Sequence, residues 1–213
     1  MPTPQPITYV RIAEVLAELG MVTQEKAQSV LDSFHEPALA HEALDPPHHI
    51  AGALEDFGVA VSIHADDVDF ADEHYPWLLT EAAALTGGKV TVGNFRFVRD
   101  DEEEEAEDGE GDEDDSEEDE EDEEDGRGVL YFDRNGEELS FLIEQESNDY
   151  LDMGAAQAAI EALSPDDDPR SFRCVDNGPE NPPGSVDDIM VLATAEQREG
   201  LYRHLGITFC EPW

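Results

Sequence analysis

The sequence predicts an α+β fold in which N-terminal helices pack with a mainly antiparallel sheet. Three observations lead to it: helical spacing of apolar residues near the N-terminus, a β-hairpin signal around residue 135, and a long acidic run between two strand-like segments. We expect residues 1–99 to hold a helical hairpin and the first strands. Residues 100–127 should form a disordered acidic loop, and residues 128–213 the second half of the same unit.

Two amphipathic helices are predicted at the N-terminus, because apolar residues recur there at i, i+3, i+4 and i+7. Gly20 is suited to end the first helix, and Thr23 to cap the second. The segment resembles a helix-turn-helix locally, but its basic residues are only Arg11 and Lys26, so we expect packing and not DNA reading. The apolar sets are Ile12, Val15, Leu16 and Leu19 in the first helix, and Ala27, Val30, Leu31 and Phe34 in the second.

The next part of the chain alternates irregular, helical and strand-like segments. Residues 35–49 are rich in proline and histidine and are expected to be irregular. A short helix is predicted over residues 50–57, and alternating apolar residues predict a strand over residues 59–63. Pro76 is favoured at the first position of a helix, so we expect a helix from there to Thr86, where two glycines end it.

The acidic run covers residues 100–125, of which 22 are Asp or Glu. Strand-like segments lie on both sides, over residues 89–99 and 128–133. A polyanion this dense cannot bury apolar surface, so we expect a solvated, self-repelling loop inserted between two strands of one sheet. In the first of these strands the apolar parity changes across Gly93 and Asn94, which predicts a β-bulge.

The clearest local signal is a β-hairpin centred on Asn135 and Gly136. Strand-like apolar patterns lie on both sides of it, over residues 129–132 and 139–143. Asn followed by Gly readily takes up the two positive φ angles of a type I′ turn, which matches the twist of the adjoining strands. The hairpin is therefore the best specified part of the predicted sheet.

The C-terminal part is predicted to continue with alternating helices and strands. A helix is expected over residues 150–163, a strand over residues 171–175 and another over residues 189–192. Thr194 is placed to cap a further helix. Residues 206–210 are expected to form a final edge strand.

The net charge of −44 limits the kinds of partner that the protein can attract. Half of it lies in the acidic run, and residues 1–99 and 126–213 carry −10 and −12. Such a body repels phosphate backbones and anionic lipid headgroups, so we expect no direct nucleic-acid binding and no membrane binding. A cationic protein would be attracted. The alternative is that the acidity reflects solubility or salt adaptation, which the low lysine content (2 Lys against 9 Arg) also fits.

A soluble cytoplasmic protein with reduced thiols is the simplest prediction. The first residues, Met1 to Pro6, lack the charge and apolarity of a signal peptide, and no apolar run approaches the length of a membrane helix. Two cysteines, Cys174 and Cys210, do not form a disulfide framework or a metal motif.

The sequence predicts neither a catalytic centre nor a metal or cofactor site. The patterns GxSxG, GxxxxGK[ST], GxGxxG and HExxH are absent. Several histidines stand beside carboxylates, but most lie in the proline-rich segment without the short, regular spacing of a zinc site. We therefore expect no cofactor, no specific metal site and no enzymatic activity.

The predicted partner-binding residues follow the second strand of the hairpin, where a tyrosine stands among carboxylates. Carboxylates accept a guanidinium in bidentate fashion and an aromatic ring can stack on it, so this segment suits a partner rich in Arg or Lys. The candidate residues are Glu144, Glu146, Asp149, Tyr150 and Asp152.

These observations together favour a non-catalytic acidic protein that captures and masks a basic protein. The most concrete version is an immunity or inhibitor protein against a cationic toxin or nuclease, which electrostatic attraction would bring to a structured acidic face. The alternative is a housekeeping or enzymatic domain whose acidity only keeps it soluble.

Overall fold

The computed structural model describes residues 6–44, 48–64, 71–99, 126–145, 152–176 and 187–210. Within these residues the α+β class is confirmed. The helical elements are α1 (Tyr9–Glu18), α2 (Gln24–Asp32), the 3₁₀ helix η1 (Leu39–His41), α3 (His48–Asp56), α4 (Ala71–Leu85), α6 (Met153–Glu161) and α7 (Ala195–Leu205). The strands are β1 (Ala60–Ile63), β2 (Val92–Arg99), β3 (Gly126–Arg134), β4 (Glu137–Gln145), β5 (Ser171–Asp176), β6 (Asp188–Ala193) and β7 (Thr208–Phe209).

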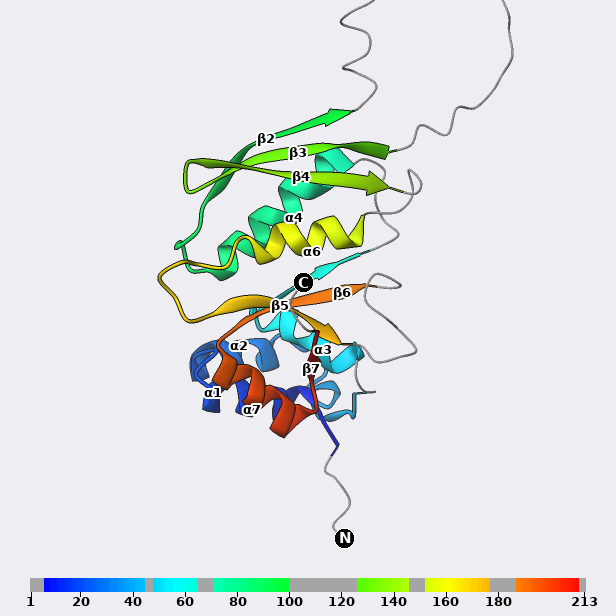
Figure 1. The fold of residues 1–213 in the computed structure, drawn as a ribbon. Coiled ribbons are helices and arrows are strands. Elements are labelled where there is room, and N and C mark those ends of the chain that lie inside the picture. The colour runs from blue at the N-terminus through cyan, green and yellow to red at the C-terminus, as the bar shows by residue number, and fades with distance from the viewer. Residues whose placement is uncertain are drawn as a thin grey trace, which may run out of the picture.

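The elements form four layers in the order sheet, helices, sheet, helices (Figure 1). The first layer is the three-stranded sheet β2-β3-β4, and the second holds α4 and α6. The third is the four-stranded sheet β1-β6-β5-β7, and α1, α2, α3 and α7 cover its far side. All pairings are antiparallel, but the strands are divided between two sheets with helices between them, which the sequence pattern did not predict.

Strands β1 and β6 of the four-stranded sheet are buried on both faces because helices cover both sides of the sheet. Every residue of β1 and of β6 is buried. One core cluster joins this sheet to α4, α6 and the inner face of the three-stranded sheet, and a second joins it to α1, α2, α3 and α7. A strand that is buried on two faces has no polar side to alternate with, so its sequence becomes a continuous apolar run.

The predicted N-terminal helical hairpin is confirmed, and so are the residues predicted to end its first helix and to cap its second. The Thr8 and Thr23 hydroxyls cap α1 and α2 by accepting from the backbone N–H groups of Arg11 and Lys26. Gly20 follows the end of α1 with a φ of 65°, a left-handed conformation that glycine adopts without a steric penalty. The predicted apolar residues of both helices lie in the second core cluster or pack against it, except Phe34, which follows the end of α2 at Asp32 and is not part of the cluster.

The prediction for the start of α4 was wrong. Pro76 lies inside the helix, which begins at Ala71, and not at its first position. The ring of a proline near the start of a helix removes one backbone hydrogen bond, a cost that tertiary packing can offset. The residue before it, Tyr75, is fully buried and its hydroxyl donates to the carbonyl oxygen of Asp152 at 3.3 Å. The buried tyrosine therefore holds the first turns of the helix in place on either side of the proline.

The predicted hairpin, bulge and insertion are confirmed in the three-stranded sheet. Asn135 and Gly136 have φ angles of 55° and 85° and connect β3 to β4. The register between β2 and β3 shifts just after Gly93, where the bulge was expected. Residues 100–125 lie outside the described residues, whereas Gly126 and Arg127, the last two residues of the predicted loop, belong to β3 and pair with β4. The strands that flank residues 100–125 are neighbours, since Arg99 of β2 is paired with β3, so the acidic run is an insertion within one sheet.

Replacing Gly136 by valine is expected to lower the free energy of unfolding by about 1–2 kcal/mol, because a β-branched side chain is strained at positive φ. Gly136→Asn is the matched control, since asparagine tolerates the left-handed region and should cost much less. Urea unfolding of both variants provides the measurement. Equal losses in the two variants would contradict a turn that depends on positive φ.

Candidate functional site

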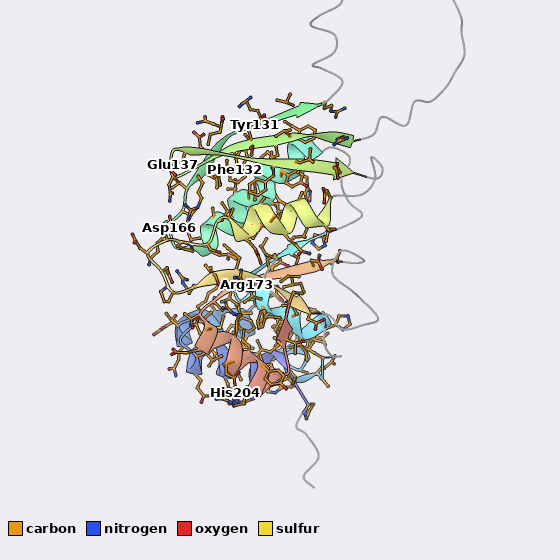
Figure 2. All side chains as sticks on the ribbon, viewed as in Figure 1. Tyr131, Phe132, Glu137, Asp166, Arg173 and His204 are labelled. Atoms are coloured by element: carbon orange, nitrogen blue, oxygen red, sulfur yellow. The ribbon has the colours of Figure 1, made fainter. Side chains whose placement is uncertain are left out.

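The outer face of the three-stranded sheet is turned away from the rest of the described chain (Figure 1). Successive residues of a strand point to opposite faces, so the buried side chains of Leu130, Phe132 and Ile143 assign the remaining positions to the outside. Figure 2 shows Tyr131 and Phe132 as sticks on this sheet, next to each other along β3. We call the following residues the outer sheet face: Arg96, Val98, Arg127, Val129, Tyr131, Asp133, Glu138, Ser140, Leu142 and Glu144.

A row of apolar side chains crosses this face from one edge of the sheet to the other. Val98 is paired with Val129, and Val129 is paired with Leu142, so the three side chains are direct cross-strand neighbours. Val98 and Val129 are half-buried, and Leu142 is 50% exposed. An exposed apolar row on a sheet face provides contact area for a partner.

An aromatic and charged row lies beside the apolar one. The guanidinium of Arg96 lies over the Tyr131 ring, 4.2 Å from its centroid, and its Nη2 is 3.0 Å from a carboxylate oxygen of Glu138. On the other side of the apolar row, Arg127 pairs with Glu144 at 3.3 Å. Four charges of the outer sheet face are thus balanced in pairs, and the Asp133 carboxylate, which accepts from the Asn94 amide, leaves the face with a small negative charge in a chain whose net charge is −44.

The acidic run begins and ends next to this face. It follows Arg99 at the end of β2 and leads into Gly126 at the start of β3, and these two strand ends are neighbours. The apolar row and the Arg127–Glu144 pair lie at this same end of the sheet. The largest concentration of negative charge in the sequence is therefore joined along the chain to the end of a weakly charged, partly apolar surface.

Two of the five predicted partner-binding residues lie within the described chain. Glu144 is exposed on the outer sheet face, whereas Asp152 caps α6. The Asp152 carboxylate accepts from the backbone N–H of Ala155 and from that of Glu144, both at 2.9 Å, and so it ties the end of β4 to the start of α6. A role for Asp152 in binding a guanidinium remains a prediction. The other three residues lie outside the described chain: Glu146, Asp149 and Tyr150.

Sequence reasoning did not single out Arg96, Tyr131 and Leu142 as members of one surface. The alternation of inward and outward residues in the hairpin could have identified part of this surface. In β4 the inward apolar residues alternate with Ser140, Leu142 and Glu144, which therefore point outward. Carrying that parity across the turn to β3 identifies Tyr131 as an outward residue. Arg96 could be added only from the observed register, because the bulge shifts the pairing of β2.

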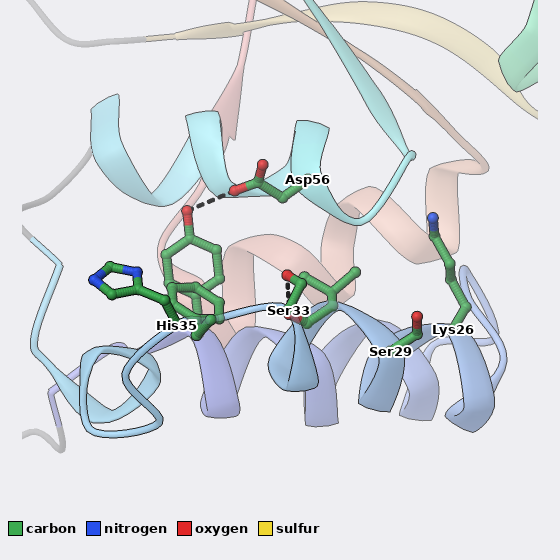
Figure 3. A pocket seen from close by; sticks show the side chains of 8 residues that line it. Lys26, Ser29, Ser33, His35 and Asp56 are labelled. Atoms are coloured by element: carbon green, nitrogen blue, oxygen red, sulfur yellow. Dashed lines mark hydrogen bonds between the residues drawn. The ribbon is translucent and has the colours of Figure 1, made fainter.

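A second candidate site is an open cleft of about 480 Å³ between α1, α2 and α3 (Figure 3). The Tyr9 hydroxyl donates to the Asp56 carboxylate at 2.7 Å, and burial together with that carboxylate raises the pKa of the phenol. Ser33 donates to the carbonyl oxygen of Val30. The cleft is lined by Tyr9, Lys26, Ser29, Val30, Ser33, Phe34, His35 and Asp56, and its polar lining can admit a small polar molecule.

An acidic cluster in the loop before β5 contains a buried carboxylate. The Asp168 side chain is only 7% exposed, and its oxygens lie 2.6 Å from an Arg170 nitrogen and 2.9 Å from the Lys89 ammonium. The backbone N–H of Arg170 also donates to it, at 2.9 Å. The hydrogen bonds from Arg170 hold the pKa of the Asp168 carboxyl well below its usual range. These contacts join the loop to the segment that follows α4, so Asp168 stabilises the fold.

Comparison with protein-family models, with curated proteins and with solved structures found no match to this chain. None of the helices that the structure describes is both long enough and apolar enough to cross a membrane. Among the described residues, no three His, Cys, Asp or Glu side chains are grouped so that they could hold a metal ion.

Proposed function

We propose that this chain is a non-catalytic binding protein that captures a basic protein on its outer sheet face, with the acidic run supplying the long-range attraction. The most concrete version is an immunity or inhibitor protein against a cationic toxin or nuclease. The observation that supports it best is the position of the run, whose 22 acidic residues join two neighbouring strands at the edge of an exposed and partly apolar surface.

The two parts of this surface would act at different stages of binding. Charge attraction speeds the encounter and is screened over about 8 Å at physiological ionic strength. Docked side chains determine how long the complex lasts, and tyrosine and arginine are common among the residues that dominate interface energies. Tyr131 and Arg96 already stack on one another, so docking would cost little conformational entropy in these two side chains.

The area of the outer sheet face is smaller than the area that a stable protein–protein interface buries on one partner. Three strands of about nine residues cover about 30 Å by 14 Å, or about 400 Å². A standard interface buries about 800 Å² on each partner. A complex that used the outer sheet face alone would therefore be short-lived, and the neighbouring acidic segments would have to add contacts or raise the association rate.

The proposal predicts separate kinetic effects for the two parts. Partners are first isolated with the full chain as bait, and a basic protein among them is then measured by surface plasmon resonance. Replacing the acidic residues of the run by Asn and Gln should lower the association rate tenfold or more, on the order of the steering effects of charged surfaces. Leu142→Ser should speed dissociation about tenfold through lost apolar contact. Neutralising Glu144, Glu146 and Asp149 together should also speed dissociation.

Tyr202→Ser is the matched control, because Tyr202 is 56% exposed on α7, in the helical layer at the far side of the molecule. It should change neither rate. Added salt should slow association more than it speeds dissociation. If no basic protein is isolated, or if the complex responds neither to salt nor to the substitutions, the proposal is wrong and the solubility alternative stands.

A further inference from the structure

The only two cysteines of the chain face each other across β5 and β7. The register of β5 and β7 pairs Val175 with Phe209, and the next position along the strands brings Cys174 opposite Cys210. The backbone N–H of Cys210 donates to the carbonyl oxygen of Cys174 at 3.0 Å, which extends the ladder to this pair. Both cysteines are free thiols.

This register places the two side chains on the same face of the sheet at a separation that suits a disulfide. Directly opposite residues of an antiparallel pair have Cα atoms about 4.5–5.5 Å apart. Disulfides join cysteines whose Cα atoms are about 4.4–6.8 Å apart. Both side chains contact the core cluster that lies between the two sheets. No movement of the strands past one another is therefore needed to bring the sulfur atoms together.

The surroundings of the two thiols differ in exposure. Cys174 is 3% exposed within the core cluster, whereas Cys210 is half-buried at the margin of the same cluster. Burial raises the pKa of both thiols, and the negative charge of Asp188 raises the pKa of each further. Asp176 adds to the effect at Cys210, while a hydrogen bond with Cys174 opposes it. Both groups are thus protonated at neutral pH, and Cys210 is the one that a reagent can reach.

We propose that Cys174 and Cys210 are a modification site that forms a reversible disulfide and fastens β7 to β5. The oxidant is a low-molecular-weight disulfide such as oxidised glutathione. The Cys210 thiolate attacks it and releases one glutathione thiol, leaving a mixed disulfide on Cys210. The Cys174 thiolate then attacks the Cys210 sulfur and releases the second glutathione. The two cysteines lose two protons and two electrons, and the oxidant is reduced to two thiols.

The disulfide would act on the last element of the described chain. β7 has only two residues, lies at the edge of the sheet and follows α7, which belongs to the second core cluster. A bond from Cys210 to the buried end of β5 would hold this edge strand and restrict the unfolded chain. The side chains of directly opposite residues lie slightly farther apart than in a relaxed disulfide, and such strained bonds are easily reduced.

The test exposes the full chain to mixtures of reduced and oxidised glutathione and follows mass and thermal unfolding. The wild-type chain should lose the mass of two hydrogen atoms, and its melting temperature should rise by about 5 °C. Dithiothreitol should restore both values. The reaction should accelerate as the pH is raised, because only the thiolate attacks.

Single variants separate this reaction from oxidation of an isolated thiol. Cys174→Ser should stop at the mixed disulfide, with one glutathione on Cys210. Cys210→Ser should stay unmodified, because its remaining thiol is buried; it also serves as the test if Cys174→Ser does not fold. The proposal is overturned if the wild-type chain accumulates glutathione without an internal disulfide. It is also overturned if both cysteines of the wild-type chain stay reduced in a glutathione mixture that is oxidising enough to convert a small-molecule dithiol to its disulfide.

Discussion

Gly128→Ala is expected to lower the free energy of unfolding by about 2–3 kcal/mol, although alanine restricts the unfolded chain more than glycine does. Gly128 lies on β3 opposite the end of β2. A Cβ atom added there would lie 2.6 Å from the carbonyl oxygen of Val98 and 2.8 Å from the Phe97 ring. The ring could rotate away, but the carbonyl belongs to the paired strand and can move only if the two strands separate.

Gly93→Ala is the matched control for this substitution. Gly93 lies in the same pair of strands, but a Cβ atom there would meet nothing within 4 Å and the residue has no positive φ. It should therefore leave stability unchanged within about 0.5 kcal/mol. Urea unfolding of the two variants makes the comparison. Similar stabilities for both would show that the strands at Gly128 can separate without cost.

Asp168→Asn is expected to lower the free energy of unfolding by about 2–3 kcal/mol at neutral pH, the effect of breaking hydrogen bonds to a charged group. Asparagine keeps the size of the side chain but cannot balance the positive charges of Lys89 and Arg170, which both contact this carboxylate. Asp167→Asn is the control, because Asp167 is exposed on the same loop. Its effect should be too small to measure by urea unfolding, and an equal effect of the two substitutions would contradict the special role of Asp168.

The same pair of proteins gives a pH test with a defined sign. The folded state holds the pKa of Asp168 well below that of the unfolded chain, so the carboxylate adds stability above the unfolded pKa of about 3.9 and loses it as the pH falls further. The difference in stability between wild type and Asp168→Asn should be constant above about pH 5 and shrink below about pH 4. Acidification also reduces the charge repulsion among the other carboxylates of the chain. This effect is the same in both proteins, so it cancels when their free energies of unfolding are subtracted. A difference that stays constant down to pH 3 would contradict this assignment.

Local signals predicted most of the elements. Asn135 and Gly136 specify their turn through backbone conformation. Thr23 specifies a helix start through one side-chain hydrogen bond, and Thr194 does so through a capping box with Gln197. Such signals depend on residues that are close in sequence. The division into two sheets depends instead on which faces α4 and α6 cover, and no short stretch of sequence contains that information.

The candidate site was predictable only in part, for a related reason. An aspartate near a strand end can be a surface carboxylate or a helix cap, and Asp152 proved to be a cap once the start of α6 was known. Glu144 is exposed, on the side that the alternation of β4 gives it, and its role in binding a partner stays a prediction. Val98 and Arg96, which share the outer sheet face with Glu144, come from a strand on the other side of the acidic run, and the bulge between them and Gly93 shifts their register.

The pairing of β1 with β6 has a consequence for the time at which the chain can fold. Ala60 pairs with Val191, so β1 waits for a partner that the ribosome adds much later in the chain. At about 5–20 residues per second, a ribosome needs on the order of ten seconds to add the intervening residues. Both core clusters include residues of β1 and β6, so neither can be completed earlier. The hairpin of β3 and β4 can pair much sooner, and we therefore expect the four-stranded sheet to close after this hairpin has formed.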